Sequence, residues 1–469
     1  MTEHVEIAIV GAGPAGMAAA TWLAGRGVPT LVLDEQPAPG GQIYRSVERV
    51  AESDPARLAA LGPDYEHGQS LTRAFRASGC AFWPRATVWQ ITPQHDLWVS
   101  RDGASRRIRA DRVILATGAM ERPVPISGWT IPGVLTVGAL QILLKSSGMA
   151  AGAELVLLGS GPLLYQFAAQ CLALGIRPVA FLETTVRSNF MRAAPLLPAA
   201  LAGHGLSYLR KGLALKLKLR ASGIPIYTAC TEVKVDGTDI VQSVSFRSGG
   251  RSRTVAASMV AVHEGVIPMQ QLARQVGCTH VWDVRQHCFR PSLDEWGNSS
   301  IPGIAIVGDG AGIAGARAAE NAGRIAAVEA AWALGRLTAR ERDRLTACER
   351  RELARHLSVR PFLDALYAPP PAIGTPADEI LVCRCEEVTA GAVRAAAAQG
   401  ELSPNRIKRI LRCGMGPCQG RMCGPVVSRL IAAVGRCSLD EVGYYNIRAP
   451  LKPLPLEEIA AIDGEGYAG

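Results

Sequence analysis

Residues 5–16 read VEIAIVGAGPAG, and this stretch decides the fold of the front of the chain. Apart from Glu6, its first six residues are apolar, which is typical of a strand buried in a parallel sheet. The glycines that follow have the spacing G-x-G-x-x-G, and the alanine-rich segment up to about residue 24 predicts a helix. A second apolar strand, 29–33, ends in two acids, Asp34 and Glu35. This order of elements predicts a Rossmann-like dinucleotide-binding domain.

Each position of this motif has a physical role. The first glycine permits a tight turn, the second lets the backbone approach a pyrophosphate, and the third lets helix and strand pack closely. The free N–H groups at the helix N-terminus favour phosphate binding. Glu35 is placed to accept ribose hydroxyls, which favours FAD or NAD over NADP. The predicted nucleotide contacts of this region are Gly11, Gly13, Pro14, Ala15, Gly16, Asp34 and Glu35.

A second motif of the same kind lies inside the first domain. The apolar strand 155–158 is followed by GSGPLL at 159–164, a helix, a strand at 178–182 and an acid. Leu164 replaces the third glycine and should hinder close packing of helix and strand. The segment therefore either binds a nucleotide or keeps the fold without taking hydride from NADH, and its acid disfavours NADP in both cases. The predicted contacts here are Gly159, Gly161 and Glu183.

Two further segments carry a family resemblance. They are RVILATGAM at 112–120 and IPGIAIVGDGAGIAG at 301–315. Over residues 4–337 the chain resembles the two-dinucleotide-domain flavoproteins of the pyridine nucleotide–disulfide oxidoreductase superfamily. The resemblance implies FAD at the front site, with Asp309 on its ribityl chain; a turn aspartate that caps the next helix is the alternative. Further contacts that it implies are Gly41, Gln42, Thr117, Gly118, Gly308 and Asp309.

Cysteines separate this chain from the disulfide reductases of that superfamily. Residues 1–337 contain no C-x-x-C pair, which excludes disulfide reductase chemistry. Five of the 12 cysteines instead fall within 383–423, which opens with C-R-C and closes with CGMGPCQGRMC. A C-x-C pair, 32 residues and a C-x4-C pair suit iron–sulfur ligation, although four cysteines can also hold zinc. A flavoprotein needs a one-electron outlet, so a 2Fe–2S cluster is the prediction, with ligands Cys383, Cys385, Cys418 and Cys423; spacing alone does not exclude Cys413.

The C-terminal module resembles the bacterioferritin-associated-ferredoxin-like 2Fe–2S domain. As a whole the chain resembles the α (A) subunits of heteromeric amino-acid and opine dehydrogenases, such as octopine and nopaline oxidases, D-hydroxyproline dehydrogenase and the hydrogen cyanide synthase B subunit. This implies a β subunit that has its own flavin and oxidises the C–N bond of an amino or imino acid. Electrons would pass to a quinone or redox-protein acceptor. The resemblance also implies an FMN at a subunit interface and leaves open NAD or ATP in the inserted domain.

The predicted architecture is α/β, with one Rossmann-like domain inserted in another and a small, mostly helical 2Fe–2S domain. The 469 residues are enough for several domains. The predicted boundaries are 1–139 and 263–337 for the FAD-binding domain, 140–262 for the inserted NAD-like domain, 338–378 for a helix and Pro-rich linker, 379–437 for the 2Fe–2S domain and 438–469 for a tail.

Composition narrows the partners and the location. No run of 18 apolar residues and no signal peptide is evident, so we expect a cytoplasmic protein with at most peripheral contact at the inner face of the membrane. The net charge of +9 comes with no nucleic-acid-binding motif, so a nucleic-acid partner is not expected. No catalytic triad or paired carboxylates are evident. The alternatives to an electron-relay role are a stand-alone NADH-dependent reductase, a non-catalytic electron-transfer protein and a glycine-oxidising subunit of hydrogen cyanide synthase.

Overall fold

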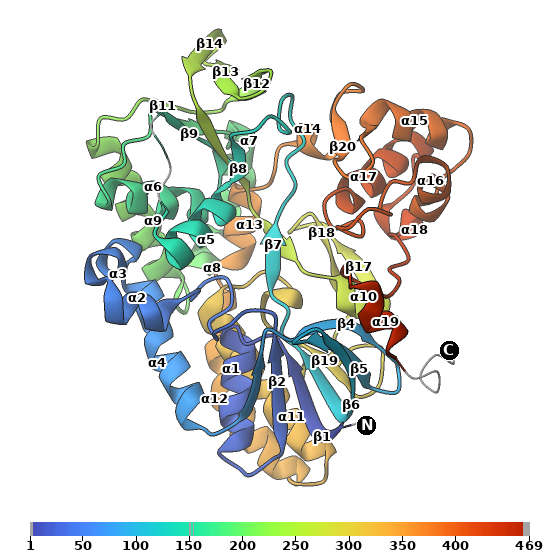
Figure 1. Cartoon of the computed structure of the whole chain (residues 1–469). Helices are drawn as coiled ribbons and strands as arrows, with labels where there is room; N and C mark the ends of the chain where they lie inside the picture. Colours follow the sequence, from blue (N-terminus) through green and yellow to red (C-terminus); the bar gives the residue numbers. More distant parts are fainter. Residues whose placement is uncertain (1–2, 150–151, 153, 463–469) are drawn as a thin grey trace.

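A computed structural model describes residues 3–149, 152 and 154–462. It contains two Rossmann-like sheets, one above the other in Figure 1, and a helical module beside the upper one. The front sheet has the strand order β3-β2-β1-β6-β5-β4, and β19 pairs with β6. Its strands β1, β2, β3, β6 and β19 are parallel, whereas β4, β5 and β6 form an antiparallel meander. The bounds are β1 (Glu3–Val10), β2 (Thr30–Asp34), β3 (Ala81–Pro84), β4 (Thr87–Ile91), β5 (Asp96–Arg101), β6 (Ala104–Leu115) and β19 (Ile304–Ile306).

Small residues let the helices pack closely on this sheet. Helix α1 (Pro14–Ala24) begins with proline, which suits the first helical position. It crosses α11 (Ala316–Ala333) so tightly that a Cβ on Gly323 would lie 2.1 Å from the carbonyl oxygen of Ala15. The charged helix α12 (Ala339–Leu357) follows and begins with a capping box made by Thr338 and Glu341. The remaining front helices are α2 (Val47–Ser53), α3 (Pro55–Leu61) and α4 (Pro63–Ala77).

The inserted domain has a second parallel sheet, with the order β11-β10-β9-β15-β8. A three-stranded antiparallel sheet, β12-β13-β14, projects beyond it (Figure 1). The segment around Leu213 and Lys216 is helical, as part of α9. The bounds are β8 (Val134–Thr136), α5 (Val137–Ser147), β9 (Leu155–Ser160), α6 (Pro162–Ala173), β10 (Ala180–Glu183), α7 (Arg187–Ala193), η1 (Ala194–Leu196), α8 (Leu197–Ala200), α9 (Gly205–Ala221), β11 (Ile226–Tyr227), β12 (Thr231–Gly237), β13 (Val241–Ser248), β14 (Arg251–Ala256) and β15 (Met259–Glu264).

Short elements join the two Rossmann-like domains. The chain leaves the front domain through β7 (Ala119–Glu121) and returns through its antiparallel partner β16 (Val266–Pro268). It then forms α10 (Gln271–Gln275), the hairpin β17 (His280–Asp283) and β18 (Cys288–Pro291), and the turn η2 (Gly308–Gly310). After α12, the predicted linker contains α13 (Arg360–Leu366) and α14 (Pro371–Gly374). Helix α13 packs against α7, and α14 packs against the C-terminal module.

The C-terminal module is a small helical domain with its own core. Thr389 and Ser403 cap its first two helices, as their sequence positions indicate. The third helix begins at Gly424, because residues 418–423 form a turn. Residues 442–451, beyond the predicted boundary at 437, contribute to the same core. The bounds are β20 (Leu381–Cys383), β21 (Val388–Thr389), α15 (Ala390–Ala398), α16 (Pro404–Leu411), α17 (Gly424–Gly435), α18 (Leu439–Val442) and α19 (Leu456–Ala460).

No helix within the described residues combines the length and the apolar content that a bilayer crossing requires.

Candidate cofactor sites

A cavity of about 740 Å³ runs along the glycine loop of the front domain. Its walls come from the carboxyl ends of the parallel strands, where α/β sheets bind ligands. Every residue that we predict to contact FAD at the front site lines it, except Gly16. The lining residues from that prediction are Gly11, Gly13, Pro14, Ala15, Asp34, Glu35, Gly41, Gln42, Thr117, Gly118, Gly308 and Asp309.

The glycines of this loop are required by close backbone contacts. Gly11 has a φ of +108°, and a Cβ there would lie 2.4 Å from the carbonyl oxygen of Ala116. A Cβ on Gly16 would lie 1.9 Å from the carbonyl oxygen of Gly11, so the backbone of Gly16 packs directly against the loop on the side away from the cavity. On the open side, a Cβ on Gly41 would lie 2.9 Å from the Cα of Gly13. The resulting cradle of bare backbone fits a pyrophosphate.

The two acids at the end of β2 have different contacts. Asp34 accepts hydrogen bonds from the backbone N–H of Ala12 at 2.6 Å and of Gln36 at 2.8 Å, so it fastens the glycine loop. Burial raises the pKa of Asp34, although these hydrogen bonds oppose that effect. Glu35 is half exposed and forms an ion pair with Lys452 from the C-terminal tail. Glu35 is therefore the more exposed acid of the two at the cavity, and its contact with a ribose stays a prediction.

Asp309 combines its two possible roles. One of its carboxylate oxygens accepts hydrogen bonds from the backbone N–H groups of Ala314 and Gly315, each at 2.9 Å, in the turn that leads into α11. The residue also lines the front cavity. The turn-capping alternative is thus present in the structure, and a contact with a ribityl chain stays a prediction.

Sequence reasoning missed Lys145, which is buried behind the loop that carries Gln42. Its ammonium donates to the carbonyl oxygen of Gln42 at 3.2 Å and to the side-chain oxygen of Gln141 at 2.9 Å. Burial lowers the pKa of Lys145 to about 7. Because α5 carries both Lys145 and Gln141, the inserted domain holds this front-site loop in place. Lys145 is an isolated lysine in an apolar helix and belongs to no motif, so no sequence signal could have identified this contact.

The second glycine motif has much less space. A cavity of about 210 Å³ remains at its mouth, and Gly161 is the one predicted contact of this motif that lines it. Tyr367 and Pro369, which follow helix α13, form part of its wall. Leu164, in place of the third glycine, is fully buried in the core.

The acids of the second site are already engaged. Glu183 is buried, accepts a hydrogen bond from the Tyr165 hydroxyl at 2.5 Å and lies 3.7 Å from the Lys216 ammonium. Glu264 accepts hydrogen bonds from Thr184 at 2.6 Å and from Ser160 at 2.8 Å. Burial raises the pKa of Glu264. These contacts leave neither carboxylate free at the cavity mouth.

A buried arginine separates the two cavities. Arg122 lines both of them and donates to the carbonyl oxygens of Glu264, Gln286 and His287 at 3.0, 2.7 and 2.7 Å. Burial lowers the pKa of Arg122. His263 is 2% exposed, and its Nδ1 lies 2.8 Å from a carboxylate oxygen of Glu121. His263 therefore has the contacts of a structural histidine.

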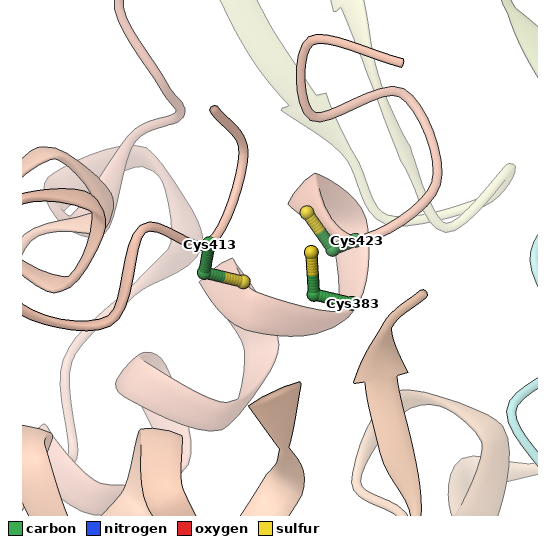
Figure 2. Close-up of side chains that lie close together, drawn as sticks. All are labelled: Cys383, Cys413 and Cys423. Atoms are coloured by element: carbon green, nitrogen blue, oxygen red, sulfur yellow. The ribbon is translucent and has the colours of Figure 1, made fainter. Parts of the chain in front are cut away.

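The cysteine module gathers five thiols in two groups. Figure 2 shows Cys383, Cys413 and Cys423 with their sulfurs facing a common point, and the three Sγ atoms lie within 4.8 Å of one another. Hydrogen bonds among these three thiols lower the pKa of Cys383 and raise the pKa values of Cys413 and Cys423, so the three groups share protons as one set. The other two, Cys385 and Cys418, interact with each other nearer the surface.

This arrangement fits a 2Fe–2S cluster, which takes four thiolates, two on each iron. Cys383 and Cys423 of the buried group, and Cys385 with Cys418 nearer the surface, would supply these four thiolates. The assignment of those four as ligands stays a prediction. The spacing of the cysteines left open whether Cys413 is a ligand. In the structure, the Sγ atom of Cys413 lies within 4.8 Å of the Sγ atoms of Cys383 and Cys423.

The front cavity extends to this module. Besides the glycine loop and the loop that carries Gly41 and Gln42, Arg421 and Met422 line this cavity. Met422 immediately precedes Cys423, and the Nε of Arg421 donates to the carbonyl oxygen of Cys418 at 3.0 Å. Leu451 and Lys452 of the tail complete the wall. Residues that flank predicted cluster ligands thus also bound the predicted flavin site.

Comparisons with known proteins agree with this arrangement. The model of the pyridine nucleotide-disulphide oxidoreductase family matches residues 5–335, and that of the BFD-like [2Fe-2S] binding domain matches residues 381–433. The opine oxidase A subunit of Rhizobium meliloti is 46% identical over 96% of this chain and 97% of its own length. The HcnB subunit of hydrogen cyanide synthase from Pseudomonas aeruginosa is 35% identical over 95% of this chain and 96% of its own.

A solved structure shows the same fold over nearly the whole chain. L-proline dehydrogenase from P. horikoshii superposes with a TM-score of 0.70 and 18% identity, covering 98% of this chain and 80% of that one. The predicted fold class is confirmed, and the two matched families imply a flavin and a 2Fe–2S cluster. The chain therefore belongs to the pyridine nucleotide-disulphide oxidoreductase family, in the group that contains the opine oxidase A subunits and the HcnB subunits of hydrogen cyanide synthase, and it is an oxidoreductase.

Proposed function

We propose that this chain is the electron-relay subunit of a heteromeric dehydrogenase that oxidises the C–N bond of an opine or a related imino or amino acid. The relatives named as opine oxidase A subunits support an opine of the octopine or nopaline type over a hydroxyproline-like substrate. Their names describe one part of a larger enzyme, which supports a partner chain. In this proposal that partner is a β subunit that carries its own flavin and the substrate site.

The observation that carries the proposal is that residues of the glycine loop and residues of the cysteine module line the same front cavity. Its glycine loop would hold FAD, and Arg421 and Met422 at its far end adjoin the predicted cluster ligand Cys423. When bound, the flavin supplies two-electron chemistry and the cluster supplies one-electron chemistry. The chain itself would bind both groups in adjacent positions. No residue of this chain is assigned as a catalytic acid or base.

The second site supports this function over a stand-alone NADH-dependent reductase. Only about 210 Å³ remains there, whereas pockets for drug-sized ligands span about 300–1,000 Å³. Glu183, which would accept ribose hydroxyls, is bonded to Tyr165 instead. NAD or ATP in the inserted domain is accordingly not part of the proposal. The proposal does include an FMN at the contact with the partner chain, a quinone or redox-protein acceptor, and a cytoplasmic site of action.

The test is anaerobic bleaching of flavin absorbance in the purified chain, with cluster absorbance followed in parallel. NADH, octopine, nopaline, hydroxyproline and glycine are added separately, with and without the co-expressed partner. We expect no response to NADH and bleaching by an opine only when the partner is present. Rapid bleaching of the isolated chain by NADH would instead establish a reductase. Bleaching by glycine alone among the amino acids would assign the complex to the hydrogen cyanide synthase type, which the 35% identical HcnB relative supports.

A further inference from the structure

The cluster site contains five thiols, one more than a 2Fe–2S cluster uses. Cys413 is fully buried, and its Sγ lies within 4.8 Å of the Sγ atoms of both Cys383 and Cys423. In Figure 2 its sulfur points toward those two, from the segment that follows α16. Cys385 and Cys418 already supply a second pair of thiols. Cys413 therefore has a position beside the inner pair of ligands that a thiol S–H can use for hydrogen bonding.

A phenol reaches one sulfur of this inner pair, that of Cys423. The Tyr445 hydroxyl lies 3.7 Å from the Sγ of Cys423, and the side chain is 2% exposed. Its ring lies on the turn that carries the cysteines, so closely that a Cβ on Gly414 or Gly420 would come within 2.9 or 2.6 Å of ring carbons. The two glycines leave room for the ring, and this fixes the direction of its hydroxyl.

This inference rests on the proposed 2Fe–2S cluster with ligands Cys383, Cys385, Cys418 and Cys423. We propose that Cys413 and Tyr445 are not ligands of this cluster but donate hydrogen bonds to the sulfurs of the inner pair, Cys383 and Cys423. These hydrogen bonds raise the reduction potential of the cluster. Reduction adds negative charge to the cluster, and donors that point at its sulfurs stabilise that charge more in the reduced state. Both are positioning residues, since they act on the cluster through its ligands. The consequence is that the cluster, at the acceptor end of the relay, has a higher reduction potential than its ligands alone would give it.

The experiment uses the full chain, purified anaerobically, with five variants: Cys413→Ala, Cys413→Ser, Tyr445→Phe, the double variant Cys413→Ala/Tyr445→Phe and the control Cys437→Ala. Cys437 is a half-buried cysteine of the same module outside the thiol group. The readouts are iron and sulfide content, the EPR spectrum of the reduced cluster and its midpoint potential in a redox titration. None of these depends on turnover.

We expect every variant to keep the parent's iron, sulfide and EPR g values. The midpoint potential should shift to more negative values in Cys413→Ala and in Tyr445→Phe, and further in the double variant. Cys413→Ser should stay close to the parent, because its hydroxyl still donates. Cys437→Ala should not move the potential.

Three results would overturn the inference. Loss of iron or altered g values in both Cys413 variants would make Cys413 a ligand. Unchanged midpoint potentials in Cys413→Ala and Tyr445→Phe, with the cluster intact, would leave both residues with packing roles alone. A parent chain that holds zinc, or no iron and sulfide, would refute the cluster of the proposed function itself. That failure is visible before any variant is made and is thus distinct from the other two.

Discussion

The two glycine motifs of this chain share a fold and differ in what surrounds them. Both follow a fully parallel strand and open a helix that begins with proline. The front motif faces a cavity of about 740 Å³, and the second faces one of about 210 Å³. Glu35 of the first stands half exposed at the rim, whereas Glu183 of the second is buried and bonded to Tyr165. A binding motif therefore specifies a backbone shape, and segments outside it decide whether a ligand has room.

The strongest test of this contrast is to remove the front motif's close packing. In Gly16→Ala the new Cβ would lie 1.9 Å from the carbonyl oxygen of Gly11, so the loop must move. We expect the FAD content of the purified chain to fall by more than about tenfold. Absorbance and released-flavin fluorescence measure it. Gly212→Ala, in helix α9 with no atom within 4 Å of its Cβ, is the matched control and should keep its flavin.

The converse test is to open the second motif. Tyr165→Phe removes the hydrogen bond to Glu183, and Tyr367→Ala takes away part of the cavity wall. We expect the parent to give no detectable heat with NADH or ATP in calorimetric titrations. The double variant should gain about fivefold or more in affinity for one of them, because a freed carboxylate and added space restore what the motif lacks. Tight binding of NADH by the parent would contradict the contrast between the sites.

We expect the structure around Arg122, which separates the two cavities, to become less stable at acidic pH. The backbone carbonyl of His287 holds Arg122, and burial, followed by the charge of Arg429, lowers the pKa of His287 to about 4. An unfolded histidine has a pKa of about 6.5, so the unfolded chain binds more protons between pH 6.5 and 4 and stability falls as the pH falls through that window. The parent should lose a few degrees of Tm there.

The variant His287→Gln should have a flatter Tm profile over the same pH window than the parent, as followed by differential scanning fluorimetry. His4→Gln, at an exposed pair with Asp111, is the control and should follow the parent. Parallel profiles for all three proteins would show that His287 does not contribute to the pH dependence.

The smallest effect is expected at the rim of the front site. Lys452 and Glu35 form a pair whose side chains are 30% and 50% exposed, and such pairs contribute below about 1 kcal/mol. Lys452→Ala should therefore weaken FAD binding by less than about fivefold in reconstitution titrations. Lys452→Arg should match the parent. A loss above about tenfold would make the tail residue a main determinant of the site.

What the sequence could predict was set by how local each feature is. In the turn at Gly11 to Gly16, Gly16 packs on the carbonyl oxygen of Gly11 within the same motif, and the spacing of these glycines predicted both the fold and the lining of the cavity. The pairing of Tyr165 with Glu183 also lies within one strand–helix unit, yet no spacing rule identifies it. Such a contact depends on side-chain packing.

The distant contributions could not be found in this way. Arg421 and Lys452 reach the front cavity from about 400 residues away, and helix α13 with Tyr367 narrows the second one from the linker. The spacing of the cysteines was compatible with more than one set of four ligands. Only the folded module shows Cys413 against Cys383 and Cys423. Placing these residues requires the tertiary arrangement of whole domains.

One short segment near the end of the described chain contacts both predicted cofactor sites. Tyr445 lies against Cys423, and a few residues later the backbone N–H of Leu451 bonds to the carbonyl oxygen of Trp89 while Lys452 pairs with Glu35. A ribosome makes this segment long after the glycine loop and after the last of the clustered cysteines. Neither site has its full wall until synthesis has passed Lys452, so a product that stops before Tyr444 would contain every motif and still lack part of each site.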